Sequence, residues 1–203
     1  MFIKYFNGMS IVTLFASLVI TSCASTKVTD SWGEEREGKA FQHPMIIAIS
    51  DSQQTRQIYE KHFVSELKEN NIVSTASYTL ISSKQKLNRE TVVNAIKGTE
   101  IDSVLVTYLV LADSKIKADE SPVNMGYSGN VEDLKMSDTI ISNRGRSNST
   151  EVVGLKNDLY DVATKKMIWS VQTKTVGPES IDQVVTEVTE LLINQMFSDG
   201  LLE

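Results

Sequence analysis

The amino-acid sequence predicts an α/β domain in which a β-α-β-α-β unit is followed by an antiparallel hairpin and a C-terminal helix, all on one mixed sheet. Two observations predict it. Short apolar runs typical of buried strands alternate with segments of helical periodicity over residues 41–111. Two alternating segments joined by a short turn then precede a long amphipathic stretch near the C-terminus. An α+β arrangement is the alternative.

The first strand and helix are marked by an apolar run and capping residues. Residues 45–49 are continuously apolar, which suits a strand buried on both faces. Asp51, with Gln54 three residues later, supplies N-cap chemistry for a helix that ends at Asn70. The side chains that we expect on its packing face are Ile58, Tyr59, His62, Phe63, Glu66 and Leu67.

Three further elements complete the β-α-β-α-β unit. Residues 72–78 predict a second, weaker strand, and Asn88 caps a short helix that stops at Gly98. Residues 104–111 carry the strongest strand signal in the chain. Crossovers of this length predict right-handed parallel connections between the three strands.

A long polar segment follows. Residues 113–150 are rich in Ser, Asn, Asp and Gly, and we expect a loop, part of which can pair as a strand around Ile140-Ile141. Structureless loops longer than about 15 residues are uncommon in compact domains and tend to be functional or disordered. This segment is therefore a candidate for binding a partner.

A hairpin and a helix end the chain. Residues 151–162 and 167–176 alternate apolar and polar side chains on either side of a turn. Gly177-Pro178 then opens a helix that Gly200 ends. Its apolar stripe, wide enough to pack on a sheet, consists of Ile181, Val184, Val185, Val188, Leu191, Leu192 and Met196.

The N-terminus has the pattern of a secretory leader. Residues 1–22 carry one ionisable side chain, Lys4, ahead of an apolar run at 9–20 and small or polar residues before Cys23. This order is typical of a signal peptide, and the run falls short of the roughly 20 apolar residues of a membrane-spanning helix. An uncleaved anchor helix is the alternative.

The residues at the cleavage point carry a more specific signal. Ile20-Thr21-Ser22-Cys23 resembles the lipobox of bacterial lipoproteins. The resemblance implies cleavage before Cys23 and attachment of lipid to its sulfur, with acyl chains such as palmitate. Two or more acyl chains hold a protein stably on a membrane. Ala24 is not the Asp associated with inner-membrane retention, which implies the periplasmic face of an outer membrane. An unpaired core cysteine is the plainer alternative.

The rest of the chain divides into a linker and a domain. We expect residues 23–40 to form the lipidated N-terminus and a flexible tether, and residues 41–203 to form a single periplasmic α/β domain. The linker is polar with little apolar periodicity, and a coil of that length would span roughly 20–25 Å. Trp32 interrupts it, and we expect its side chain to dock on the domain edge or on the membrane surface.

Composition excludes several classes of protein. The chain is 41% hydrophobic, which is too much for a wholly disordered protein. Its formal net charge is −6, which argues against a nucleic-acid partner, because such binding depends on Lys and Arg meeting phosphates. A single cysteine excludes an internal disulfide framework and a multi-cysteine metal site.

The motifs predict no catalytic, cofactor-binding or metal-binding residues. The segment at 126–129 (GYSG) lacks one residue of the serine-hydrolase pattern and reads as a polar turn. His43 precedes the first strand, and His62 reads as a partly buried packing residue on the first helix. Zinc, calcium, Walker and dinucleotide patterns are absent. Asp51 after the first strand would repel a phosphate at that helix N-terminus.

The charged side chains read as structural or solvated. Asp158 and Asp161 lie three apart on a strand, on opposite faces, which favours strand-end and turn roles over an acid/base pair. Arg56 and Glu60, four apart on the first helix, predict a surface ion pair. The basic cluster at 143–148 reads as a solvated loop, with an anionic partner such as lipid headgroups as the alternative.

Taken together, the residues resemble a bacterial lipoprotein family of uncharacterised function, and more distantly the curli-secretion lipoprotein, lipoprotein activators of penicillin-binding proteins and the N-terminal domain of the Tol translocation protein. The positions that carry the family resemblance include Trp32, the Asp102–Thr107 run (DSVLVT), Leu159-Tyr160-Asp161, Ile168-Trp169-Ser170 and Gly200-Leu201-Leu202. The resemblance implies a binding or assembly module. The 113–150 segment lacks the amphipathic alternation of a membrane hairpin, which argues against pore formation.

These observations lead to one expected function and two alternatives. We expect a membrane-anchored, non-enzymatic lipoprotein that binds an envelope protein or associates with itself, with residues 113–150 as the candidate binding segment. The first alternative is a periplasmic carrier that holds a lipid or small molecule between sheet and helices. The second is an enzyme, which would need acid, base and polar groups gathered in one cleft.

Overall fold

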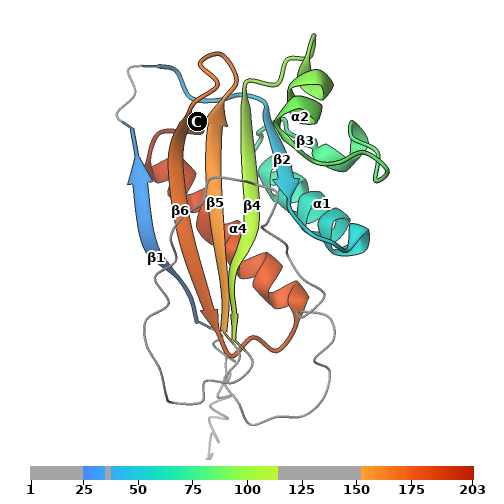
Figure 1. The fold of residues 1–203 in the computed structure, drawn as a ribbon. Helices are drawn as coiled ribbons and strands as arrows, with labels where there is room; N and C mark the ends of the chain where they lie inside the picture. Colours follow the sequence, from blue (N-terminus) through green and yellow to red (C-terminus); the bar gives the residue numbers. More distant parts are fainter. Residues whose placement is uncertain (1–24, 35–37, 114–151) are drawn as a thin grey trace, which may run out of the picture.

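The computed structural model describes residues 25–34, 38–113 and 152–203. The strands among these residues are β1 (Ser25–Gly33), β2 (Pro44–Ala48), β3 (Thr75–Ala76), β4 (Ser103–Asp113), β5 (Val152–Asp161) and β6 (Met167–Val176). They form one sheet in the order β1-β6-β5-β4-β2-β3 (Figure 1). β2 pairs in parallel with β3 and β4, and the remaining neighbours are antiparallel. The predicted α/β class and single mixed sheet are confirmed.

The first helix, α1 (Gln53–Glu69), forms where the sequence predicts it, but its cap lies one residue later than expected. The Ser52 side chain accepts a hydrogen bond from the Thr55 backbone N–H at 3.2 Å. Asn70 is the C-cap, and Asn71 follows with φ of 64°, a left-handed value that turns the chain out of the helix. The predicted helix end is therefore confirmed.

The middle of the β-α-β-α-β unit differs from expectation. The strand expected at 72–78 is reduced to the two-residue β3, because the chain turns into a short 3₁₀ helix, η1 (Ser77–Thr79). The second helix, α2 (Arg89–Ile96), forms as predicted: the Asn88 side chain accepts from the Thr91 backbone N–H at 2.9 Å. Gly98 follows it with φ of 80°.

The C-terminal half follows the prediction closely. β5 and β6 form the expected antiparallel hairpin, and β5 also pairs with β4. Helix α4 (Ile181–Ser198) begins after Ser180, whose side chain accepts from the Gln183 backbone N–H at 3.1 Å. Gly200, with φ of 68°, follows the helix as expected. In the parts of the chain that the structure describes, none of the helices is both long enough and apolar enough to cross a membrane.

Two hydrophobic clusters cover opposite faces of the sheet. α1 and α4 lie on one face (Figure 1), where Ile46, Leu105 and Leu159 belong to the larger cluster. The alternate strand residues Met45 and Ile47 belong to the smaller cluster, together with side chains from α2 and its neighbouring loops. β2 is thus buried on both faces, as its continuous apolar run predicts.

The expectation of a flexible tether over residues 24–40 is wrong for most of its length. Residues 25–33 form β1, which pairs with β6 along its whole length, from Ser25 opposite Val176 to Gly33 opposite Trp169. β1 is an edge strand with a bulge between Val28 and Asp30. An edge strand with one exposed face needs few apolar side chains, and the bulge interrupts the alternation that would have indicated a strand.

Several sequence-based expectations fall outside the described residues. These are the leader at 1–22, the lipid attachment site at Cys23, and all but the first residue of the polar segment at 113–150. The latter includes the candidate strand at Ile140-Ile141, the 126–129 turn and the basic cluster at 143–148. They remain predictions from the sequence.

Candidate functional site

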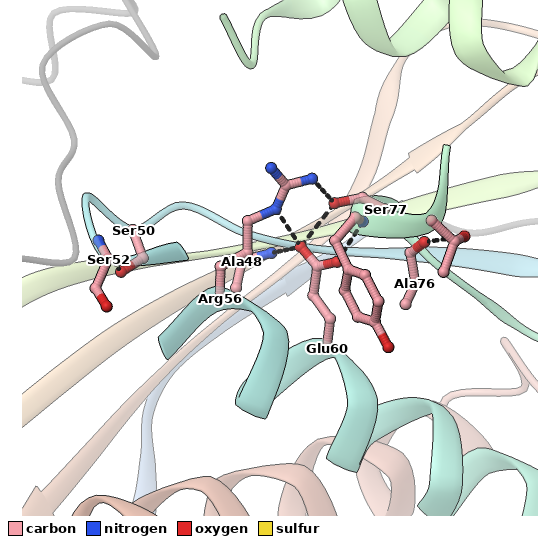
Figure 2. A network of polar contacts seen from close by, with 9 residues as sticks. Ala48, Ser50, Ser52, Arg56, Glu60, Ala76 and Ser77 are labelled. Carbon is pink, nitrogen blue, oxygen red and sulfur yellow. Dashed lines mark hydrogen bonds and ion pairs between the residues drawn. The ribbon is translucent and has the colours of Figure 1, made fainter. Parts of the chain in front are cut away.

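The described residues contain two buried carboxylates, and the first is Glu60 on α1, which is fully buried. One oxygen, Oε1, accepts hydrogen bonds from the Ala48 backbone N–H at 3.0 Å, Arg56 Nε at 2.9 Å and Ser77 Oγ at 2.6 Å. The other, Oε2, accepts from the Tyr78 backbone N–H at 2.9 Å. Figure 2 shows the Arg56 and Ser77 side chains converging on this carboxylate from either side.

This arrangement corrects the expectation of a surface ion pair. The Arg56 and Glu60 side chains are only 8% and 0% exposed, and Arg56 Nη2 also donates to Ser77 Oγ at 2.6 Å. The packing face of α1 is rotated from the one expected, since Ile58 is 38% exposed. The Glu60 network therefore joins the end of β2, the first turns of α1 and η1. Its bonds from Ser77 and Tyr78 hold η1, which follows β3 directly, next to α1.

A second chain of polar groups crosses the core beside Glu60. The Tyr59 hydroxyl lies 3.0 Å from Thr107 Oγ1, which donates to Asn157 Oδ1 at 2.9 Å. Asn157 Nδ2 then donates to the Val171 carbonyl at 3.1 Å. Because the Thr107 proton is used on Asn157, the Tyr59 hydroxyl is the donor in the first bond. Burial raises the pKa of Tyr59 well above its ordinary value, and it outweighs the hydrogen bond to Thr107, which lowers the pKa; the neighbouring Glu60 charge adds a smaller upward contribution. The phenol is therefore neutral and structural.

The second buried carboxylate, Asp158, lies in the middle of β5 and is 1% exposed. Oδ1 accepts from Ser170 Oγ on β6 at 2.6 Å, and Oδ2 accepts from the Tyr108 hydroxyl on β4 at 2.9 Å. Lys156 Nζ forms an ion pair with Oδ1 at 3.2 Å and lies over the Tyr108 ring. The strand-end role expected for Asp158 is therefore wrong. Asp161 does occupy a turn, where Oδ1 accepts from the Thr164 backbone N–H at 3.0 Å.

The two histidines lie apart from these networks. His43 precedes β2 as expected, and its Nε2 is 2.9 Å from Thr75 Oγ1. His62 is half-buried on α1, with its Nε2 3.8 Å from a Glu66 carboxylate oxygen, which agrees with a packing role. Within residues 25–34, 38–113 and 152–203, no three side chains of the His, Cys, Asp or Glu type are grouped as a metal ion would need.

The chemistry open to the two carboxylates is limited by their partners. A general base must lie within hydrogen-bond reach of the proton that it removes. Glu60 and Asp158 are 0% and 1% exposed, and each of their carboxylate oxygens accepts at least one hydrogen bond from a neighbouring residue of the fold. Such carboxylates hold strands and helices together. Sequence spacing indicated the Arg56–Glu60 pair, but no local pattern indicated Ser77, Tyr108 or Ser170 as partners.

Trp32 lies on β1 opposite Ser170, and its side chain is 50% exposed. The backbone of Trp32 is thus part of the sheet, whereas the expectation that its side chain docks on the domain edge or on the membrane surface stays a prediction. β1 begins at Ser25, two residues after Cys23 in the sequence. Any group attached to Cys23 is therefore covalently close to the edge of the sheet.

No family model matches the sequence, and no curated protein sequence matches it. Among solved structures, the chain is similar to a PelC dodecamer from Paraburkholderia phytofirmans, with a TM-score of 0.48 and 11% identity over 88% of this chain and 99% of that one. It is also similar to lipoprotein GNA1162 from Neisseria meningitidis, with a TM-score of 0.42 and 10% identity over 77% of this chain and 96% of that one. Similarity at this level does not establish a function for the chain.

Proposed function

We propose that this chain is a lipid-anchored, non-enzymatic binding or assembly module of the bacterial cell envelope. The observation that carries the proposal is the position of the single cysteine. Cys23 follows an apolar leader directly, in a lipobox-like sequence, and stands two residues before the first strand of the fold. A thiol is the nucleophile that this lipid attachment needs, and the chain has no other cysteine.

The finer parts of the proposal rest on sequence and on the carboxylate networks. Ala24 after the lipid site favours the periplasmic face of the outer membrane over retention at the inner membrane. The burial of the Glu60 and Asp158 carboxylates, and their hydrogen bonds to other elements of the fold, support a structural over a catalytic role for both residues. The partner is then an envelope protein or a second copy of the chain, engaged by an exposed surface.

The anchor is tested by Cys23→Ser. We expect this variant to keep its leader and to lose the acyl-dependent processing of the wild type, as measured by the intact mass of the protein and by fractionation of the two membranes. Ser22→Ala, a neighbouring change that keeps a small residue before the cleavage point and leaves the thiol in place, is the matched control. Normal processing and membrane fractionation of Cys23→Ser would refute the anchor.

The binding role is tested by crosslinking in cells that express a C-terminally tagged chain. We expect the anchored wild type to form discrete crosslinked species, with itself or with an envelope protein, and a chain carrying an ordinary secretory leader without Cys23 to lose them. Absence of crosslinked species with the wild type would contradict an assembly role. A lipid other than the anchor that stays bound in native mass spectrometry would instead favour a carrier.

A further inference from the structure

The start of β1 is fixed to the fold by side chains as well as by backbone pairing. Thr26 Oγ1 donates to Glu187 Oε2 on α4 at 2.6 Å and lies 2.7 Å from Thr175 Oγ1 on β6. Because the Thr26 proton is used on Glu187, the Thr175 hydroxyl donates to Thr26. Thr175 is fully buried, so this bond lies inside the sheet–helix interface. The second residue of β1 is thus held by two other elements.

Four strands meet at this end of the sheet. Ser25 is opposite Val176 on β6, Val176 is opposite Val152 on β5, and Val152 is opposite Asp113 on β4. Figure 1 shows the start of β1 and β5 and the end of β4 and β6 together at the lower edge of the sheet. α4 begins there too, five residues after β6 ends. We call this end of the sheet, where Ser25, Val176, Val152 and Asp113 lie side by side on four strands, the anchor end.

The covalent distance between the proposed lipid site and the anchor end is short. Only Ala24 lies between Cys23 and Ser25, and the two Cα-to-Cα steps of a fully extended chain span at most about 7 Å. The flexible tether expected from the sequence would have spanned roughly 20–25 Å. With β1 paired from its first residue, that freedom is absent.

We propose that the anchor end of the sheet rests directly on the surface of the lipid bilayer, which orients the whole domain. This inference rests on the proposed lipidation of Cys23, and it goes further because it names the part of the protein that contacts the membrane. Strands rise about 3.3 Å per residue, so the ten-residue β6 places the β5–β6 turn about 30 Å from the anchor end. That turn is then directed away from the membrane.

Charge does not provide a competing explanation for this orientation. Lys27 and Lys174 lie opposite each other near the anchor end, but the exposed Glu179 and Asp182 lie at the same end, around the start of α4. Among the residues that the structure describes at this end, the mixture gives no strong attraction to anionic headgroups. The orientation is therefore set by the length of the covalent connection, and we expect it to persist at about 1 M salt, where the Debye length is only about 3 Å.

The test uses the acylated full-length protein in vesicles of phosphatidylethanolamine and phosphatidylglycerol that contain a headgroup-linked nitroxide lipid. The one native cysteine is consumed by the anchor, so an added cysteine is a unique labelling site. Asp182→Cys, exposed at the anchor end, and Ala163→Cys, exposed in the β5–β6 turn, carry the same fluorophore. We expect several-fold stronger quenching at residue 182 than at residue 163, at low and at high salt.

A linker variant separates geometry from attachment. A Gly/Ser linker of about 17 residues between Ala24 and Ser25, with a root-mean-square span of roughly 20–25 Å, should abolish the difference between the two labels while the protein still floats with vesicles. Equal quenching of the two labels in the acylated protein without the linker would overturn the proposed orientation. Failure of the acylated preparation to float with vesicles would instead refute the anchor, and the orientation with it.

Discussion

Glu60 and Asp158 are both buried carboxylates paired with a cation, but they are held in different ways. The partners of Glu60 come from three elements of different kinds: the end of the strand β2, the helix α1 and the 3₁₀ helix η1. The partners of Asp158 come from three neighbouring strands on one face of the sheet. The Arg56 side chain is 8% exposed and the Lys156 side chain 14%.

Because of this difference, the two carboxylates stabilise different parts of the fold. Glu60 fixes a helix and a loop to the parallel part of the sheet, where the strands are short and backbone pairing is limited. Asp158 links strands that already share long antiparallel ladders. Removing Glu60 should therefore cost more than removing Asp158, and four substitutions, in order of expected effect, test this comparison.

The largest effect is expected from Glu60→Ala. The change leaves the Arg56 guanidinium buried without its counter-charge and deprives two backbone N–H groups of an acceptor. Loss of one partner of a buried pair costs about 3–5 kcal/mol, to be measured by urea unfolding. Glu69→Ala, an exposed position on the same helix, is the control and should stay within about 0.5 kcal/mol of the wild type. Equal costs for the two variants would contradict the role of Glu60.

Asp158→Asn should have a smaller effect. The amide keeps the shape but loses the charge that pairs with Lys156, and its N–H₂ group cannot accept from Ser170 or Tyr108. We expect a loss of about 2 kcal/mol, because Lys156 retains some contact with water. Asp51→Asn, at an exposed site, is the matched control. A loss larger than that of Glu60→Ala would reverse the comparison.

Tyr59→Phe tests the polar chain beside Glu60. Loss of the hydrogen bond to Thr107 should cost about 1 kcal/mol at neutral pH. Since burial raises the pKa of Tyr59, the unfolded chain releases this proton at a lower pH than the folded chain does. Stability contributed by the neutral phenol is thus complete below about pH 10 and is lost as pH rises further. As the pH rises above about 10, the free energy of unfolding of the wild type should therefore fall more steeply than that of Tyr59→Phe. Parallel curves of unfolding free energy against pH would contradict a neutral, buried Tyr59 phenol.

Thr26→Val should have the smallest effect on global stability, about 0.5–1 kcal/mol, because it removes a half-buried hydroxyl at a sheet edge. Its effect should be local. We expect faster amide hydrogen exchange in β1 with unchanged exchange in β4 and β5, and Ser31→Ala, at an exposed position of the same strand, should change neither. Unchanged exchange in β1 of Thr26→Val would show that backbone pairing alone fixes the strand.

The elements that could be predicted from the sequence are those whose buried residues recur at a regular local spacing. Residues 45–49 and 104–111 are apolar enough to indicate strands, and the alternation of 151–162 and 167–176 indicated the hairpin. Capping residues placed the helix ends within a residue or two. These patterns lie within short segments of the chain, so they can be recognised without knowledge of the tertiary structure.

The features that the sequence did not predict depend on contacts between distant residues. β1 is a strand because β6 supplies a backbone partner more than 130 residues later, and its own side chains carry little apolar alternation. Arg56 and Glu60 lie at a spacing that exposed pairs also show. Their burial is decided by Ser77 and Tyr78, which approach from η1. The spacing of Arg56, Tyr59, Glu60 and Phe63 does trace the buried stripe of α1, so this signal was present.

The most direct test of the lipid anchor is the intact mass of the mature protein extracted from membranes, together with the mass of its N-terminal peptide. The account predicts a chain that starts at Cys23, lacks residues 1–22 and carries acyl groups on that first residue. A mature chain that retains residues 1–22, or one that begins with an unmodified Cys23, would contradict it.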